Sequence, residues 1–185
     1  MRIISGQFKG RKMVDSSHLR TVRPTTDKNR QALFNILTSA KFLAEINFSL
    51  EDAVMLDLCC GTGAVGFEAL SRGVKNVLFV DQNMQHLEIA KKNAELFKVE
   101  KQTKFVLADA LNLRSEGVVY NFVYIDPPYR IKAKPFVENL LKREMVDKNS
   151  LIVIESGEGE FDEDGLRTLD LRRYGESFFR FCVVV

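Results

Sequence analysis

Apolar segments alternate with helix-like segments from residue 53 onward, and this alternation limits the fold more than any other feature of the sequence. Short apolar runs predict strands at 54–58, 77–80, 104–107, 122–125 and 151–154. These runs are apolar throughout, which is typical of parallel strands that helices cover on both faces. The pattern therefore predicts a Rossmann-like, doubly wound α/β fold with a mostly parallel sheet.

Helices are predicted between these strands at 64–72, 84–97 and 135–145. The second has an inward apolar stripe made of Leu87, Ala90, Ala94 and Phe97. An earlier helix is expected to start with Thr26 or Asp27 as its cap and to run through Ala40.

Two hairpins are predicted outside the alternating region. The apolar segments 166–171 and 178–185 have no helix between them, so they predict an antiparallel hairpin at one edge of the sheet. Residues 2–4 and 11–14 flank a turn that runs from Gly6 to Gly10, which predicts a short N-terminal hairpin. We therefore expect a basic N-terminal extension at 1–50 and the main domain at 51–185.

Charge is spread unevenly along the chain. Residues 1–30 carry eight basic and two acidic side chains, a net charge of +6; the whole chain is +2, so the rest carries −4. Such an arm predicts a polyanionic partner that docks at the N-terminal side, and a solvated terminus is the alternative.

Composition favours a protein of the reducing cytoplasm. No apolar run approaches the ~20 residues of a membrane span, and the N-terminus lacks the apolar stretch of a signal peptide. Three cysteines, Cys59, Cys60 and Cys182, form neither a disulfide framework nor a metal spacing. We expect no metal. We interpret Cys59 and Cys60 as packing residues without a histidine partner, and His86 as a surface residue.

A glycine-rich loop follows the first predicted strand. Gly61, Gly63 and Gly66 match the pattern G-x-G-x-x-G between a strand and a helix, where backbone can approach a ligand closely. Asp81 ends the next strand 20 residues after Gly61, a position from which a carboxylate binds ribose hydroxyls. The loop therefore predicts a ligand with an adenosine-like ribose.

The glycines alone also fit a nicotinamide dehydrogenase. Asp57 lies before the turn, where a carboxylate would repel a pyrophosphate but attract an ammonium group, as in S-adenosylmethionine. Asp109 and Ala110 are placed to meet an adenine, although Asp109 could instead cap a helix. The expected cofactor residues are Asp57, Cys59, Gly61, Thr62, Gly63, Asp81, Gln82, Asp109 and Ala110.

The stretch YIDPPYR, residues 124–130, predicts a second site beside the first. Asp126 ends the fourth strand, at the edge of the sheet where the glycine loop also lies. Two prolines stiffen the loop, so the Asp126 carboxylate and the Pro127 carbonyl become two acceptors held side by side. Two acceptors match the two hydrogens of a planar amine, and Tyr129 offers a ring on which a flipped base could stack. We expect Asp126, Pro127 and Tyr129 to be catalytic.

Motifs along nearly the whole chain resemble the RsmD family of methyltransferases. They are Arg2-Ile3-Ile4-Ser5-Gly6, Gly10-Arg11-Lys12, Arg23-Pro24-Thr25-Thr26-Asp27, Leu33-Phe34-Asn35, Asp57, the run from Gly61 to Gly73, and Asp126-Pro127-Pro128-Tyr129. The resemblance implies a seven-stranded sheet with a reversed final strand, and transfer of a methyl group to the N2 amine of a guanine in small-subunit ribosomal RNA. Ser5 and Gln31 depart from the usual family residues. Phosphates would be held by Arg2, Arg11, Lys12, Arg20 and Arg23.

Other functions fit parts of the sequence. The same pocket could methylate adenine N6 in DNA, although no target-recognition domain is evident. Enzymes that methylate glutamine side chains usually have asparagine where this chain has Asp126. A non-catalytic RNA-binding module would have no need for acceptors that orient an amine.

Overall fold

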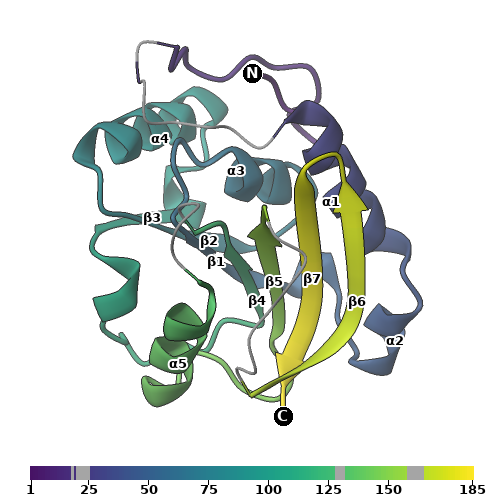
Figure 1. Cartoon of the computed structure of the whole chain (residues 1–185). Helices are drawn as coiled ribbons and strands as arrows, with labels where there is room; N and C mark the ends of the chain where they lie inside the picture. The colour runs from purple at the N-terminus through teal and green to yellow at the C-terminus, as the bar shows by residue number, and fades with distance from the viewer. Residues whose placement is uncertain (18, 20–25, 128–131, 158–164) are drawn as a thin grey trace.

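The computed structural model describes residues 1–17, 19, 26–127, 132–157 and 165–185. Its centre is a seven-stranded sheet in the order β3-β2-β1-β4-β5-β7-β6 (Figure 1). The strands are β1 (Val54–Leu58), β2 (Asn76–Asp81), β3 (Thr103–Leu107), β4 (Phe122–Ile125), β5 (Leu151–Ser156), β6 (Leu166–Tyr174) and β7 (Ser177–Val184).

Strands β1 to β5 run parallel, and the two C-terminal strands run antiparallel to their neighbours. β7 pairs with β5 through contacts such as Ile154 with Arg180, and β6 forms the edge beyond β7. The predicted α/β class, the parallel strands and the antiparallel edge hairpin are confirmed. β6 starts at the predicted residue and runs three residues further, and β7 begins and ends one residue earlier than predicted.

Helices pack on both faces of the sheet; α1 and α2 precede β1, whereas α3, α4 and α5 each connect two parallel strands. They are α1 (Asp27–Ser39), α2 (Phe42–Glu45), α3 (Ala64–Ser71), α4 (Met84–Phe97) and α5 (Lys134–Lys142), with 3-10 turns at Leu50–Asp52, Glu100–Gln102 and Ala110–Asn112. Thr26 caps α1, because its hydroxyl oxygen accepts a hydrogen bond from the Asn29 amide. Helix α5 ends three residues before the predicted position.

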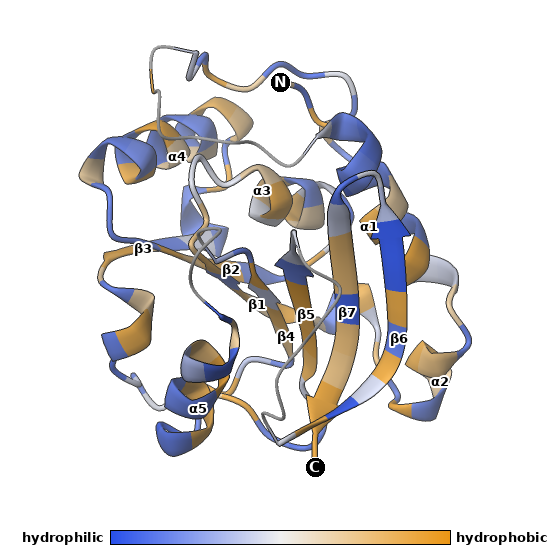
Figure 2. Cartoon of the chain, in the orientation of Figure 1, coloured by the Kyte–Doolittle hydropathy of each residue, from blue (hydrophilic) through white to orange (hydrophobic). Residues whose placement is uncertain are grey.

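Alternate residues of each strand point into two separate cores. Met55, Phe79 and Tyr124 face α1, α3 and α4, whereas Leu56, Val123 and Ile152 face α5 and the turn at Ala110–Asn112. Central strands are apolar along most of their length, and polar residues gather at the ends and on β6 (Figure 2). Burial on both faces explains why these strands read as continuous apolar runs.

The N-terminal residues form a looser structure than the predicted hairpin. One isolated antiparallel bridge joins Arg2 to Lys12, so no paired strands form there in the part of the chain that the structure describes. Ile3, Phe8 and Met13 instead insert into the core that α1, α3 and α4 share. The predicted extension is thus packed against the main domain, although its separate status stays a prediction. No helix in the described ranges is long and apolar enough to cross a membrane.

Candidate cofactor and active site

The glycine loop and the Asp126 loop lie side by side because β1 and β4 are neighbours. Leu58 pairs with Ile125 at the carboxyl ends of these strands. The next residue, Asp126, donates its amide to the Leu58 carbonyl oxygen at 3.4 Å. Since β1 is followed by β2 on one side and has β4 on the other, the two loops meet at the switch point of the sheet, where α/β proteins bind ligands.

Close packing and positive φ angles explain the glycines of the loop. Gly63 has φ 81° and forms the cap of α3. A β carbon on Gly66 would lie 2.3 Å from Cε1 of Phe79, so only glycine lets α3 approach β2 this closely. The loop also holds Cys59 at φ 58°, a conformation that non-glycine residues seldom adopt.

Asp57 stabilises the glycine loop through a buried hydrogen bond. Its carboxylate accepts a hydrogen bond from the Gly66 amide at 3.0 Å, and the residue is only 1% exposed. Burial raises the pKa of Asp57 to about 7, the Gly66 hydrogen bond lowers it, and the nearby Asp81 charge raises it further. This burial favours a role in holding the loop over direct contact with a ligand.

Asp81 is held by three donors at the end of β2. Its Oδ2 accepts from the Gly61 amide at 2.8 Å, and its Oδ1 accepts from the Asn83 amide at 2.8 Å. His86 lies with Nδ1 3.2 Å from Oδ1, so the ring donates to the carboxylate. A carboxylate fixed on three sides presents its remaining lone pairs in one direction, as ribose binding requires.

The prediction that His86 is a surface residue is wrong. The residue is only 8% exposed, and its Nε2 lies 3.3 Å from the side-chain nitrogen of Asn83. Asn83 caps α4, so the first turn of that helix folds back over the end of β2 and carries His86 to Asp81. Sequence reasoning missed this site residue, although its position five residues after a strand-ending acid offered a signal.

Four carboxylates surround Cys59. Burial, and then the charges of Asp81, Asp126, Asp57 and Asp109, raise the pKa of Cys59 to about 12. A raised pKa disfavours the thiolate form that a nucleophile requires. Burial also raises the pKa of Cys60. Acids at or near the carboxyl ends of β1, β2, β3 and β4 make this end of the sheet electrostatically negative, which suits a cationic ligand and repels a pyrophosphate.

The remaining predicted cofactor residues differ in how exposed they are. Asp109 is exposed and caps the 3-10 turn, where it accepts from the Leu111 amide at 3.0 Å and the Asn112 side chain at 2.8 Å. Ala110 and Thr62 are buried, whereas Gln82 is exposed. Their contact with a cofactor stays a prediction.

Asp126 and Pro127, which directly follow β4, are partly exposed. Just before them, the Tyr124 hydroxyl donates a hydrogen bond to the buried Glu155 carboxylate of β5, which fixes β4 where the loop begins. Tyr129, the third predicted catalytic residue, lies outside the described residues. Within the described ranges no group of three or more His, Cys, Asp or Glu side chains could hold a metal ion.

The basic residues predicted to bind RNA differ in how the protein uses them. Arg11 donates to the Leu96 carbonyl oxygen, and its guanidinium carbon lies 5.1 Å from the centre of the Phe97 ring. Its guanidinium group is therefore engaged in contacts within the protein. Arg2 and Lys12 are exposed. Arg20 and Arg23 lie outside the described residues.

Comparison with protein families places the chain. A family model described as conserved hypothetical protein 95 matches residues 1–183. The ribosomal RNA small subunit methyltransferase D of Escherichia coli is 34% identical over 160 residues, which cover 84% of this chain and 74% of that protein. The chain belongs to the RsmD family of methyltransferases.

Solved structures agree with this membership. "Putative methyltransferase yhhF from Escherichia coli" is 28% identical and has a TM-score of 0.81, with 100% of this chain and 98% of that chain covered. An RNA methyltransferase from Salinibacter ruber, solved in complex with S-adenosyl-L-homocysteine, has a TM-score of 0.64 at 16% identity and covers 88% of this chain and 94% of its own. The latter shows that the Rossmann-like methyltransferase fold is shared.

Proposed function

We propose that this RsmD-family member transfers a methyl group from S-adenosylmethionine to the N2 amine of a guanine in small-subunit ribosomal RNA. The observation that carries the proposal is the placement of Asp81, Asp109 and Asp126 at the carboxyl ends of β2, β3 and β4, where their charges and that of the buried Asp57 act together on Cys59. Amine recognition needs acceptors, and S-adenosylmethionine carries a sulfonium and an ammonium group but no phosphate. The negative charge therefore fits the cofactor, and the acceptors fit the amine.

The cofactor residues divide the work. Asp81, held by Gly61, Asn83 and His86, would accept the ribose hydroxyl hydrogens. Gly61 and Gly63 would let the backbone approach the ligand. S-adenosylmethionine, when bound, supplies an activated methyl group and a neutral thioether leaving group.

Asp126 and Pro127 would orient the amine. With the Asp126 carboxylate and the Pro127 carbonyl each accepting one N–H, the nitrogen lone pair points toward the incoming methyl group. Positive charge develops on the nitrogen during transfer, and fixed acceptors stabilise that charge. Most of the remaining rate enhancement would come from proximity and orientation, with Tyr129 clamping the base.

The ribosomal substrate is supported by the relatives and by the charge distribution. The Escherichia coli relative is by name a small-subunit ribosomal RNA methyltransferase. Ile3, Phe8 and Met13 pack the N-terminal segment into the core beside α1 and α3, so the basic residues of that segment present positive charge from the same folded domain.

Labelled S-adenosylmethionine tests the proposal. The native protein is incubated with small ribosomal subunits from a strain that lacks this activity, and with DNA as a parallel acceptor. We expect label in the ribosomal RNA, and digestion should release N2-methylguanosine. Label in DNA alone, or in another nucleoside, would refute the substrate; the absence of S-adenosylmethionine binding in calorimetry would refute the cofactor.

Replacement of His86 by alanine is expected to weaken S-adenosylmethionine binding by about tenfold, because Asp81 loses a charge-assisted hydrogen bond. Turnover at saturating cofactor should change little, since His86 does not touch the methyl acceptor. The conservative His86→Asn variant, whose amide can donate from a similar position, should recover part of the affinity. Calorimetry and cofactor-dependent kinetics measure both; equal losses in the two variants, or a loss confined to turnover, would contradict this positioning role.

A further inference from the structure

A cleft of about 370 Å³ lies between the N-terminal loop and the first turns of α1. We call it the N-terminal cleft; its lining residues are Arg2, Ile3, Ile4, Lys9, Gly10, Asp27, Lys28 and Gln31. Lys9 and Lys28 belong to the basic arm that predicts a polyanionic partner, but neither was among the five residues expected to hold phosphates. Three of the lining side chains are cationic and one is anionic, so the cleft has an excess of positive charge.

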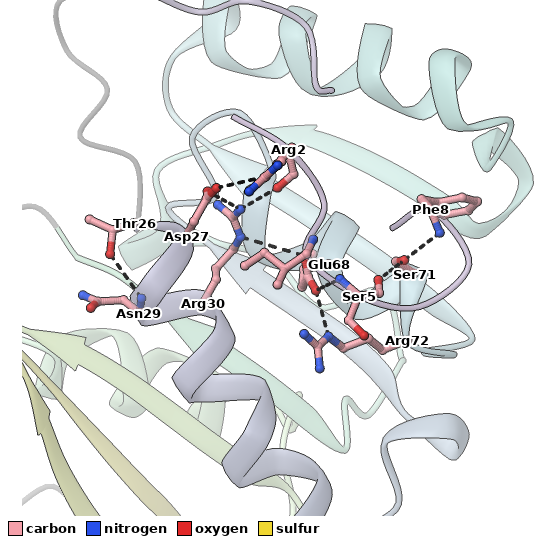
Figure 3. A network of polar contacts seen from close by, with 12 residues as sticks. Arg2, Ser5, Phe8, Thr26, Asp27, Asn29, Arg30, Glu68, Ser71 and Arg72 are labelled. Atoms are coloured by element: carbon pink, nitrogen blue, oxygen red, sulfur yellow. Dashed lines mark hydrogen bonds and ion pairs between the residues drawn. The ribbon is translucent and has the colours of Figure 1, made fainter. Parts of the chain in front are cut away.

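A buried polar network fixes the walls of the N-terminal cleft (Figure 3). Glu68 of α3 is fully buried and accepts hydrogen bonds from the Ile4 and Ser5 amides at 2.8 and 3.0 Å. Arg30 of α1, also fully buried, donates to the Arg2 carbonyl oxygen at 2.8 Å. The two walls are thus tied to the same interior charges, and the cleft exists before any ligand arrives.

The single acid of the cleft is already neutralised by the protein. The Asp27 carboxylate accepts from Arg30 at 2.8 Å, and the Arg2 side chain lies 3.9 Å away on its outer side (Figure 3). Lys9 and Lys28, in contrast, make no ion pair with any residue that the structure describes. The start of α1 adds the positive end of a 13-residue helix. The charge left over to attract a ligand is therefore positive.

The N-terminal cleft lies near the carboxyl ends of the parallel strands, where the Asp126 loop begins. The Asn29 side chain in the first turn of α1 donates to the Ser177 hydroxyl at 3.2 Å. Ser177 begins β7, whose Phe178 pairs with Ser156 at the carboxyl end of β5. β5 is the neighbour of β4, which ends just before Asp126. One RNA strand could therefore reach both the cleft and the amine-orienting loop.

We infer that the N-terminal cleft binds a backbone phosphate of the RNA substrate, through Lys9, Lys28 and Arg2. This inference rests on the proposed function. A phosphate is negatively charged and is therefore attracted by the positive charge of the cleft, and lysines bind phosphates as point charges. Phosphate contacts of this kind position a nucleic acid without reading its sequence. The cleft would thus set the register of the RNA, while the Asp126 loop engages the target base.

The test compares two double variants of the full chain. Lys9→Ala/Lys28→Ala removes both unpaired charges of the cleft. Lys142→Ala/Lys148→Ala removes two exposed lysines from the end of α5 and the connection to β5, and so changes the net charge equally. Filter binding to unmethylated small subunits is measured from low to high salt, with thermal unfolding and S-adenosylmethionine affinity as checks of folding.

We expect the cleft variant to lose on the order of tenfold in affinity at 0.1 M salt, and its slope of log K against log salt to become shallower by roughly 0.7 to 0.9, as the loss of one phosphate contact predicts. The control pair should keep the native slope. Equal slopes in the two variants, or lost affinity with an unchanged slope, would overturn the inference while leaving the proposed function intact. If the native chain fails to methylate ribosomal RNA, the proposed function falls, and the inference falls with it.

Discussion

Replacement of Asp126 by alanine is expected to abolish methyl transfer, with turnover reduced roughly 10³-fold. The carboxylate is one of two acceptors that would orient the amine and stabilise its developing charge. The S-adenosylmethionine affinity should stay within a fewfold of native, because Asp81 and the glycine loop remain in place. Single-turnover transfer at saturating cofactor and calorimetry separate the two effects.

Two further variants sharpen this test. Asp126→Asn keeps one acceptor oxygen without the charge, so partial activity is expected if orientation matters alongside charge. Asp52→Ala removes an exposed carboxylate that pairs with Lys75 at the opposite end of β1 from the glycine loop. This variant should transfer methyl groups at the native rate. Near-native turnover of Asp126→Ala would refute the mechanism, and a parallel collapse of cofactor affinity would assign Asp126 to the cofactor site instead.

Replacement of Gly6 by alanine is expected to lower the free energy of unfolding by about 3 kcal/mol or more. A β carbon there would lie 1.8 Å from the Ser71 carbonyl oxygen, and φ is +79°. The loop cannot simply move away, because the Gln7 amide donates to that same oxygen at 2.7 Å and the Phe8 amide to the Ser71 hydroxyl at 2.9 Å. Urea unfolding followed by circular dichroism measures the loss.

Gly10→Ala provides the matched control. Gly10 has almost the same φ, +81°, but a β carbon there would meet nothing within 4 Å. Only the backbone penalty remains, about 1 to 2 kcal/mol. A similar loss in both variants would show that conformation alone, and not contact with Ser71, makes glycine necessary at position 6.

The order and type of the main elements could be predicted from the sequence because they depend on local patterns. Continuous apolar runs such as Leu151–Ile154 are dictated by burial on both faces, and Thr26 acts as a cap through its own side chain. The N-terminal hairpin was predicted less well. Ile3, Phe8 and Met13 resemble hairpin residues in sequence, but contact with the main core replaced strand pairing.

The positions of acids that end strands could be anticipated, whereas a contact brought in from a helix was missed. Asp81 ends a strand, so its position follows from the fold. His86 lies in a helix of mixed polarity, and only the cap at Asn83 turns it toward Asp81. Lys9 and Lys28 come together because Arg30 and Glu68 tie two distant segments, and no local pattern records such long-range contacts.

The placement of β7 between β5 and β6 bears on how the protein is completed during synthesis. β7 leaves the ribosome after β6, yet among the described strands β6 pairs only with β7, and β5 has an open edge until β7 arrives. β7 also supplies contacts to the N-terminal helices. Phe181 packs against Phe42, and Ser177 accepts a hydrogen bond from Asn29. The sheet should therefore close only once residues 177–184 have left the ribosome, and this step also joins β7 to the N-terminal helices α1 and α2.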